Sequence, residues 1–360
     1  MDTIEDFFRL LPTVKEKEFY VWGTGNTAQL YQEGYNREDI NIVSYIDSNT
    51  DKQGDVFCGK PIIMPEAYMR KKDLPILINT AQKRAFGEIS DQILKWGGCG
   101  FNPDAIIFSW HKDEIREVYE SLDDKRSKEI YLNALTMRMT WDAPDEKYVT
   151  DDQYFAMKEY RIRRPWDVFV DCGAYVGDSI EQYIWKMDGV FRKIIGFEPD
   201  SNNFRAALKR VERLKSEWNV PKDGIEIYPY GIGDTNIEMQ METNEDNNGL
   251  GSKVVGEADN RTEKQGMKIS VISLDSFFRN RNDDVSFLKA DIESFEYKML
   301  LGAKELIKKH CPRLAICIYH NPTDMYSIPI LVRRINPYYK LFIRQHSYNL
   351  DETVLYAYED

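Results

Sequence analysis

VFVDCGAYVGDSIEQ, residues 168–182, has the pattern of an apolar strand, a turn with two glycines and the start of a helix. Gly173 and Gly177 allow a tight turn and a close approach of a ligand to the backbone. A second apolar stretch, IIGFEPD at residues 194–200, carries Glu198 at its end. The two oxygens of that carboxylate can accept hydrogen bonds from both hydroxyls of a ribose. This order of elements predicts a nucleoside site at the carboxyl ends of the two strands.

The charges around the turn indicate which class of nucleoside it can bind. Asp171 lies just before the turn and Asp178 at the start of the helix, so the two acids would repel a pyrophosphate. They would tolerate or attract an ammonium and a sulfonium group, which is the chemistry of S-adenosylmethionine (SAM). An ordinary strand–helix–strand unit with a chance Gly-x-x-x-Gly is the alternative. The residues that we expect to contact SAM are Asp171, Gly173, Ala174, Tyr175, Gly177, Asp178, Glu198, Pro199, Asn203 and Gly231.

Composition excludes several classes of function. The chain has 360 residues and a formal net charge of −12, whereas proteins that bind nucleic acid normally present a basic face. Its five cysteines include no C-x-x-C pair, so the sequence predicts neither a disulfide framework nor a zinc site. The N-terminus is acidic, and no apolar run is long enough for a membrane span. We expect a cytoplasmic protein with a small-molecule acceptor, no nucleic-acid partner and no membrane span.

The N-terminal part, residues 1–110, has a second Rossmann-like pattern. In VWGTGNTA the residues Gly23, Gly25 and Ala28 occupy the three positions of the G-x-G-x-x-G/A turn, and the next apolar strand ends at Asp47. Beyond them we expect a strand at 76–78, a helix to about residue 96 and a short strand at 105–108.

This N-terminal part resembles the small Rossmann-like domains of bacterial enzymes of surface-polysaccharide synthesis, including sugar-nucleotide acyltransferases. The resemblance rests on VWGTGNTA, on YID and on GKPIIMPEAY. It implies a nucleotide or sugar-nucleotide site, and a docking domain whose site binds nothing is the equal alternative.

Residues 111–165 are expected to form a helical linker, because apolar residues recur there at helical intervals between charged ones. Near its end, Tyr154 and Phe155 either reach over a cofactor or form a core aromatic pair.

The C-terminal part, residues 166–360, shows seven apolar stretches that we predict to be strands. The last two are joined by a short loop without a helix, so one strand should run antiparallel in an otherwise parallel sheet. A polar insertion between the third and fourth strands has strand-like ends and a middle that we expect to be a mobile substrate lid. The fold class is therefore α/β, with two Rossmann-like units. The predicted strands are 168–171, 194–198, 225–230, 286–291, 314–319, 339–344 and 353–358.

Several blocks of this part together resemble the FkbM family of SAM-dependent methyltransferases. They are FVDCGAYVGD, GFEPDSNNF, SLDSFF, FLKADIESFEYKMLLGAKELI and CPRLAICIYH, and the resemblance covers nearly all of residues 155–360. The fourth block is the most specific, since the family commonly has K-x-D-v-E-G-x-E followed by L-x-G-A there. The chain differs at Ser294, where the family usually has glycine. The resemblance implies a class I methyltransferase sheet and methyl transfer from SAM, most often to an oxygen of a sugar or another small molecule.

Three side chains are the candidate catalytic residues. Asp291 and Glu293 follow the fourth strand and His320 follows the fifth, so they should meet at one edge of the sheet. A hydroxyl acceptor must be oriented and must lose its proton, and the two carboxylates or the imidazole can do both. The competing interpretations are a helix N-terminus favoured by the acids and a histidine that only caps a strand. A divalent ion held by these three residues is a weaker alternative, and we predict no metal site.

Two other classes of function remain open. A nicotinamide-dependent oxidoreductase would use the N-terminal turn, but that part has no Tyr-x-x-x-Lys pair. A SAM-binding protein without catalytic activity is the third possibility, for which Ser294 is the supporting feature.

Overall fold

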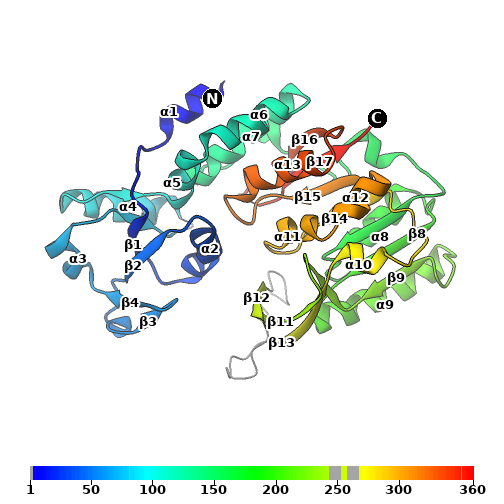
Figure 1. The fold of residues 1–360 in the computed structure, drawn as a ribbon, viewed down its shortest axis with the longest axis horizontal. Coiled ribbons are helices and arrows are strands. Elements are labelled where there is room, and N and C mark those ends of the chain that lie inside the picture. The colour runs from blue at the N-terminus through cyan, green and yellow to red at the C-terminus, as the bar shows by residue number, and fades with distance from the viewer. Residues whose placement is uncertain (1–2, 81, 243–252, 258–266, 350) are drawn as a thin grey trace.

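The computed structural model describes residues 3–80, 82–242, 253–257, 267–349 and 351–360. It has an N-terminal α/β unit, shown in blue and cyan in Figure 1, and a C-terminal α/β unit, shown from green to red. Helices α6 and α7 lie along one side of the molecule between the two units. No helix among the described residues is long and apolar enough to cross a membrane.

The N-terminal unit is built on a sheet with the strand order β3-β4-β2-β1-β5-β6. Strands β1, β2, β4, β5 and β6 are parallel, and the two-residue strand β3 runs antiparallel to β4. The predicted glycine turn lies between β1 and α2. The elements are α1 (Ile4–Leu10), β1 (Glu18–Trp22), α2 (Asn26–Arg37), β2 (Asn41–Ile46), β3 (Val56–Phe57), β4 (Lys60–Ile63), α3 (Pro65–Lys71), β5 (Ile76–Ile78), α4 (Lys83–Lys95) and β6 (Gly100–Phe101).

The strand predicted at 105–108 is wrong, because those residues belong to helix α5 (Pro103–Trp110). Asn102 caps this helix, and its side chain accepts a hydrogen bond from the backbone amide of Ala105. Pro103 is the first helical residue, a position that suits its fixed backbone angle. The apolar run that follows is buried on all sides, and periodicity alone does not separate a buried helix from a buried strand.

The segment between the units is helical up to residue 140, with α6 (Lys112–Ser121) and α7 (Lys125–Thr140). Beyond α7 it contains two 3-10 turns, Glu146–Tyr148 and Lys158–Arg161. Helix α7 packs on the C-terminal sheet, where the Ser127 hydroxyl accepts a hydrogen bond from the Ile343 amide at 3.0 Å. Helix α7 therefore packs against strand β16 of the sheet that carries the candidate site, while α6 packs on α13.

The C-terminal unit has the predicted seven-stranded sheet, in the order β16-β17-β15-β14-β7-β8-β9. Strand β17 is antiparallel to both of its neighbours and the other strands are parallel, so the predicted fold class is confirmed. The strands are β7 (Val168–Cys172), β8 (Lys193–Phe197), β9 (Ile225–Tyr228), β14 (Phe287–Ala290), β15 (Arg313–Cys317), β16 (Lys340–Gln345) and β17 (Thr353–Tyr358). The helices are α8 (Asp178–Lys186), α9 (Ser201–Glu217), α10 (Leu274–Phe278), α11 (Glu296–Leu301), α12 (Lys304–His310) and α13 (Asp324–Ile335).

A separate small sheet is formed by the insertion, in the order β10-β13-β11-β12. The predicted third strand ends earlier than expected, because the chain leaves β9 after Tyr228 and enters β10. Most of the predicted mobile lid falls on residues 243–252 and 258–266, which lie outside the described residues. The strands of the small sheet are β10 (Tyr230–Ile232), β11 (Ile237–Glu242), β12 (Lys253–Glu257) and β13 (Met267–Ile272).

Candidate active site

The turn after β7 is pressed against the end of β14. Gly173 has a φ of 84°, and a Cβ atom added there would lie 1.9 Å from the Asp291 carbonyl oxygen. A side chain at this position would therefore force the two strand ends apart. The amides of Gly173 and Ala174 both donate to the Phe197 carbonyl, at 3.1 and 2.9 Å, which ties the same turn to the end of β8.

Glu198 lies directly after β8 and faces this turn. One of its carboxylate oxygens accepts a hydrogen bond from the Tyr175 amide and the other from the Asp200 amide, both at 2.9 Å. Burial raises the pKa of Glu198 to about 7, although the two amides oppose this. Each oxygen keeps a further lone pair, so the carboxylate can still accept both hydroxyls of a ribose. Glu198 and the turn after β7 therefore fit the nucleoside half of SAM.

The two acids beside the turn lie in different environments. Asp171 is fully buried and forms an ion pair with Lys289 at 3.1 Å, and it also accepts a hydrogen bond from the Ser179 hydroxyl. Asp178, the first residue of α8, is exposed. The charge of Asp171 is therefore balanced inside the protein, so its part in attracting a cationic ligand is smaller than the sequence suggested.

The other expected SAM contacts surround the same strand ends. Ala174 is part of the core, and Gly177 forms the N-cap of α8 with a φ of 81°. Asn203 is buried in the first turn of α9, and Pro199 is partly buried. Gly231 lies in the small sheet, where an added Cβ would be 3.2 Å from Val271. The turn and Glu198 thus lie together, and Gly231 lies beside them, since its added Cβ would also be 3.9 Å from Pro199.

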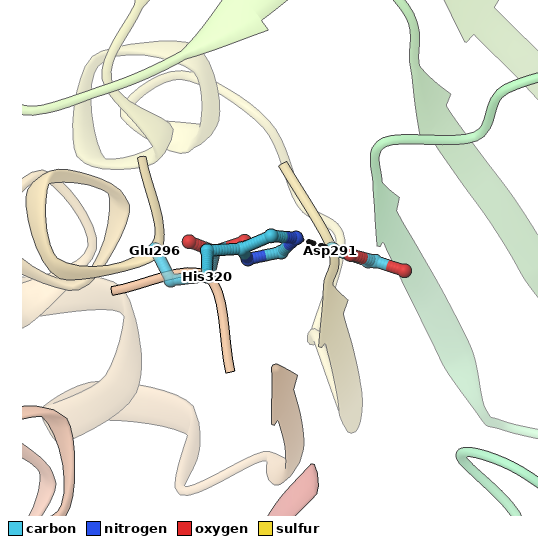
Figure 2. Close-up of side chains that lie close together, drawn as sticks. All are labelled: Asp291, Glu296 and His320. Atoms are coloured by element: carbon cyan, nitrogen blue, oxygen red, sulfur yellow. Dashed lines mark ion pairs between the residues drawn. The ribbon is translucent and has the colours of Figure 1, made fainter. Parts of the chain in front are cut away.

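The three candidate catalytic residues come together, and Glu296 joins them. Asp291 follows β14, Glu296 begins α11, and His320 lies in the loop after β15. The Nε2 atom of His320 is 3.4 Å from Asp291 Oδ1 and 3.7 Å from Glu293 Oε2, and its Nδ1 atom is 3.1 Å from Glu296 Oε1. Figure 2 shows the imidazole ring between Glu296 and Asp291.

These carboxylates change the protonation of the ring. Burial lowers the pKa of His320, but the charges of Glu296, Glu293 and Asp291 outweigh it and raise the pKa to about 10. Burial raises the pKa of Asp291, but Lys289, His320 and a hydrogen bond from Tyr154 outweigh it and leave that pKa below its usual value. At neutral pH this cluster therefore holds a carboxylate at Asp291 and, with no other cation present, an imidazolium at His320.

Two tyrosines orient Asp291. The Tyr154 hydroxyl donates to Oδ2 at 2.6 Å, and the Tyr319 hydroxyl donates to Oδ1 at 3.3 Å. Tyr154 thus reaches the candidate catalytic residues, whereas Phe155 is fully buried in the core. Sequence reasoning assigned no site role to Tyr319 or Glu296. The signal available for Glu296 was a second acid three residues after Glu293, although Glu293 itself lies before the helix that begins at Glu296.

The N-terminal glycine turn also has the expected backbone. Gly23 has a φ of 110°, and a Cβ there would lie 2.8 Å from the Asn79 carbonyl oxygen. Asp47, at the end of β2, accepts hydrogen bonds from the Thr24 hydroxyl and from Lys52 Nζ, the latter at 3.0 Å. The acid that would hold a ribose in a dinucleotide site is therefore already engaged by two side chains.

Residues 171–346 match the family model "Methyltransferase FkbM domain". A methyltransferase FkbM from Methylobacillus flagellatus KT is similar in structure, with a TM-score of 0.56, 22% identity, and coverage of 95% of this chain and 90% of that one. That likeness shows a shared fold.

More distant structures cover a smaller share of the chain. An rRNA methylase from Streptococcus thermophilus has a TM-score of 0.32 and 15% identity, covering 56% of this chain and 92% of that one. A putative methyltransferase from Streptococcus mutans in complex with SAH has a TM-score of 0.34 and 9% identity. The match covers 55% of this chain and 92% of that one. No curated protein matches the chain. Residues 171–346 are a methyltransferase domain of the FkbM family, and its cofactor is SAM.

Proposed function

We propose that this chain transfers the methyl group of SAM to an oxygen of a small hydroxyl-bearing acceptor, a sugar or a glycan precursor. The observation that carries the proposal is the position of Asp291 and Glu293 at the end of β14, the strand beside β7. A cofactor held by Glu198 and an acceptor held by these carboxylates would then meet where the strand order reverses.

The chemistry needs an oriented acceptor and a proton acceptor. When bound, SAM supplies a methyl carbon that the acceptor oxygen attacks in line, while the sulfur leaves with the electron pair of the broken bond. Glu293 and Asp291 would accept the acceptor's hydrogen bonds, and one of them would take the hydroxyl proton. His320, predicted from sequence as a candidate base, is better suited to hold the carboxylates in place, because its raised pKa keeps the ring protonated at neutral pH.

We assign the N-terminal unit to positioning of a nucleotide-linked sugar, as in polysaccharide synthesis. Its supporting feature is the ammonium of Lys52, which is partly exposed beside the glycine turn. The net charge of −12 favours a small acceptor over nucleic acid. The five cysteines are all free thiols, which favours a cytoplasmic setting.

Titration calorimetry with SAM tests the cofactor site. Wild type should bind SAM, and Glu198→Ala should bind it at least tenfold more weakly, because the ribose loses its acceptor. The control is Glu226→Gln, which changes a glutamate on the next strand that pairs with Lys193 and Arg281. Wild type that binds no SAM, or Glu198→Ala that binds as wild type does, would contradict the assignment.

The pH dependence of SAM binding provides a further test. The carboxylate form of Glu198 accepts both ribose hydroxyls, whereas the protonated form has lost acceptor capacity. Because the pKa of Glu198 is about 7, the carboxylate fraction falls as the pH drops through neutrality. We therefore expect SAM affinity to decrease from about pH 8 to about pH 6 in wild type, and to be flatter over this range in Glu198→Gln.

The acceptor class is tested by release of S-adenosylhomocysteine from SAM with a panel of nucleoside-diphosphate sugars, free sugars and methyl glycosides. An active acceptor should lose turnover in Asp291→Asn and in Glu293→Gln while SAM affinity stays the same. Activity with amines alone would contradict O-methylation. Nicotinamide-dependent turnover without SAM would favour the oxidoreductase alternative.

A further inference from the structure

The cluster around His320 contains buried polar atoms that lack hydrogen bonds. Glu296 is fully buried, and its Oε2 atom makes no hydrogen bond within the described residues. The side chain of His320 is 6% exposed, and neither ring nitrogen has hydrogen-bond geometry to a described residue, despite ion-pair distances to the carboxylates. Buried polar groups without partners are costly, and a bound ion is one of the usual reasons for them.

The same atoms converge on one place. Asp291, Glu296 and His320 each offer one ligand atom, and these atoms lie within 4.8 Å of one another. A divalent cation with bonds of about 2.1 Å holds its ligand atoms about 3 to 4 Å apart, so small side-chain rotations would close the site. The three residues come from separate elements that meet at the acceptor side of the sheet (Figure 2).

The charge of the cluster also favours a cation. Nearby Lys289 is paired with Asp171 at 3.1 Å, and Arg37 is paired with Asp324 at 3.1 Å. The carboxylates that face His320 thus share one imidazole, which carries at most a single positive charge. Lys289 also lowers the pKa of Asp291, but it balances Asp171 at the same time. A divalent ion would balance both carboxylates and leave the ring neutral, which is the form of histidine that binds metals.

The surroundings of Asp291 resemble the outer shell of a metal site. Tyr154 holds Oδ2 with a short hydrogen bond of 2.6 Å, while Oδ1, which faces His320, receives only a longer one of 3.3 Å from Tyr319. Glu296 is fixed in the same way, because its Oε1 accepts the Ile292 amide at 2.7 Å. Each carboxylate is thus held by a short hydrogen bond to one oxygen, as metal-ligating carboxylates are. In Glu296 the bonded oxygen, Oε1, also faces His320, and Oε2 has no hydrogen bond to a described residue.

We propose that Asp291, Glu296 and His320 bind a divalent cation, which would coordinate a hydroxyl of the methyl acceptor. A mixed set of carboxylate oxygens and one imidazole nitrogen suits Mn²⁺, Fe²⁺ or Zn²⁺ better than Ca²⁺, which prefers oxygen ligands alone. The acceptor role rests on the proposed function, since it supposes that the acceptor lies beside SAM. The cation would lower the pKa of the bound hydroxyl and make it a better nucleophile.

Metal binding can be measured without the acceptor. The chain, dialysed against a chelator, is titrated with Mn²⁺ and followed by electron paramagnetic resonance, with Zn²⁺, Mg²⁺ and Ca²⁺ as competitors. We expect one Mn²⁺ per chain and a nitrogen coupling from the coordinated imidazole. Glu296→Gln, which keeps the oxygen for the Ile292 amide, should weaken binding at least tenfold, and His320→Gln should remove the nitrogen coupling.

Control variants distinguish the loss of a metal site from misfolding of the chain and from failure of the proposed function. Glu226→Gln, on β9, should bind Mn²⁺ as wild type does. SAM calorimetry on Glu296→Gln should match wild type, which shows that the variant is folded and that the cofactor site is separate. If wild type binds no Mn²⁺ saturably, or if Glu296→Gln and His320→Gln bind it unchanged, the metal site is refuted. SAM binding would stand in either case.

Discussion

Ser294 follows Glu293, and both have left-handed backbone conformations, with φ values of 79° and 53°. A non-glycine residue in this region costs about 1–2 kcal/mol, which glycine avoids at a smaller entropic cost in the unfolded chain. Since Arg37 of the N-terminal unit reaches the Ser294 carbonyl at 3.5 Å, the conformation is also held from outside the turn.

We expect Ser294→Gly to raise the free energy of unfolding by about 0.5–1 kcal/mol, because strain is relieved without a change in the turn. Urea unfolding followed by circular dichroism measures this difference. Ser109→Gly in helix α5 is the control, and it should lower stability by a similar amount because its backbone is helical. Equal losses in the two variants would show that the Ser294 backbone is not strained.

Strands β7 and β14 are joined by more than their backbone ladder. Lys289 of β14 is the register partner of Asp171 of β7, and their side chains form an ion pair in which both are at most 3% exposed. Lys289 Nζ also donates to the Gly173 carbonyl at 2.8 Å. One side chain thus connects β14, β7 and the glycine turn that follows β7.

Lys289→Met should therefore destabilise the chain by about 3–5 kcal/mol, the cost of leaving a buried charge without its partner. Adding Asp171→Asn to this variant should recover part of the loss, because the buried carboxylate that lost its ion-pair partner is then removed. Urea unfolding of the single and double variants measures both effects. Lys340→Met, on β16, is the control and should change stability far less, since its pair with Asp360 is exposed. A loss in Lys289→Met no larger than in this control would contradict the argument.

The strands and the residues at their ends were predictable from the sequence, because apolar runs and turn residues are local signals. Asp291 and His320 could be expected together, since parallel strands end at one edge of a sheet. The short helix α5 was missed because a fully buried run has no periodicity. Tyr154 could not be assigned to Asp291, which lies 137 residues away and is reached only through the packing of the linker on the sheet.

The two α/β units meet close to the candidate site. Arg37 ends α2 and Glu38 is its C-cap, and both contact the start of α13, the helix after His320. Arg37 donates to Asp324 and to the Thr323 hydroxyl, both at 3.1 Å. The Tyr326 hydroxyl donates to Glu38 at 3.0 Å. Helix α2 starts at the N-terminal glycine turn, and its far end contacts the segment between His320 and α13.

We expect Arg37→Ala to loosen this segment, because Asp324 is 1% exposed and would lose its cationic partner. Burial already raises the pKa of Asp324 to about 6 against the effect of Arg37, so its removal would raise that pKa further. Hydrogen exchange of peptides covering 291–296 and 320–326 should accelerate at least tenfold, or about 1.4 kcal/mol, while the turn at 173–178 stays protected.

Arg37→Lys should restore part of the protection. Arg84→Ala, an exposed arginine of α4, is the control and should exchange as wild type does. Faster exchange throughout the C-terminal sheet would instead mean that Arg37 supports global stability, and unchanged exchange at 320–326 would rule out coupling between the two units through this residue.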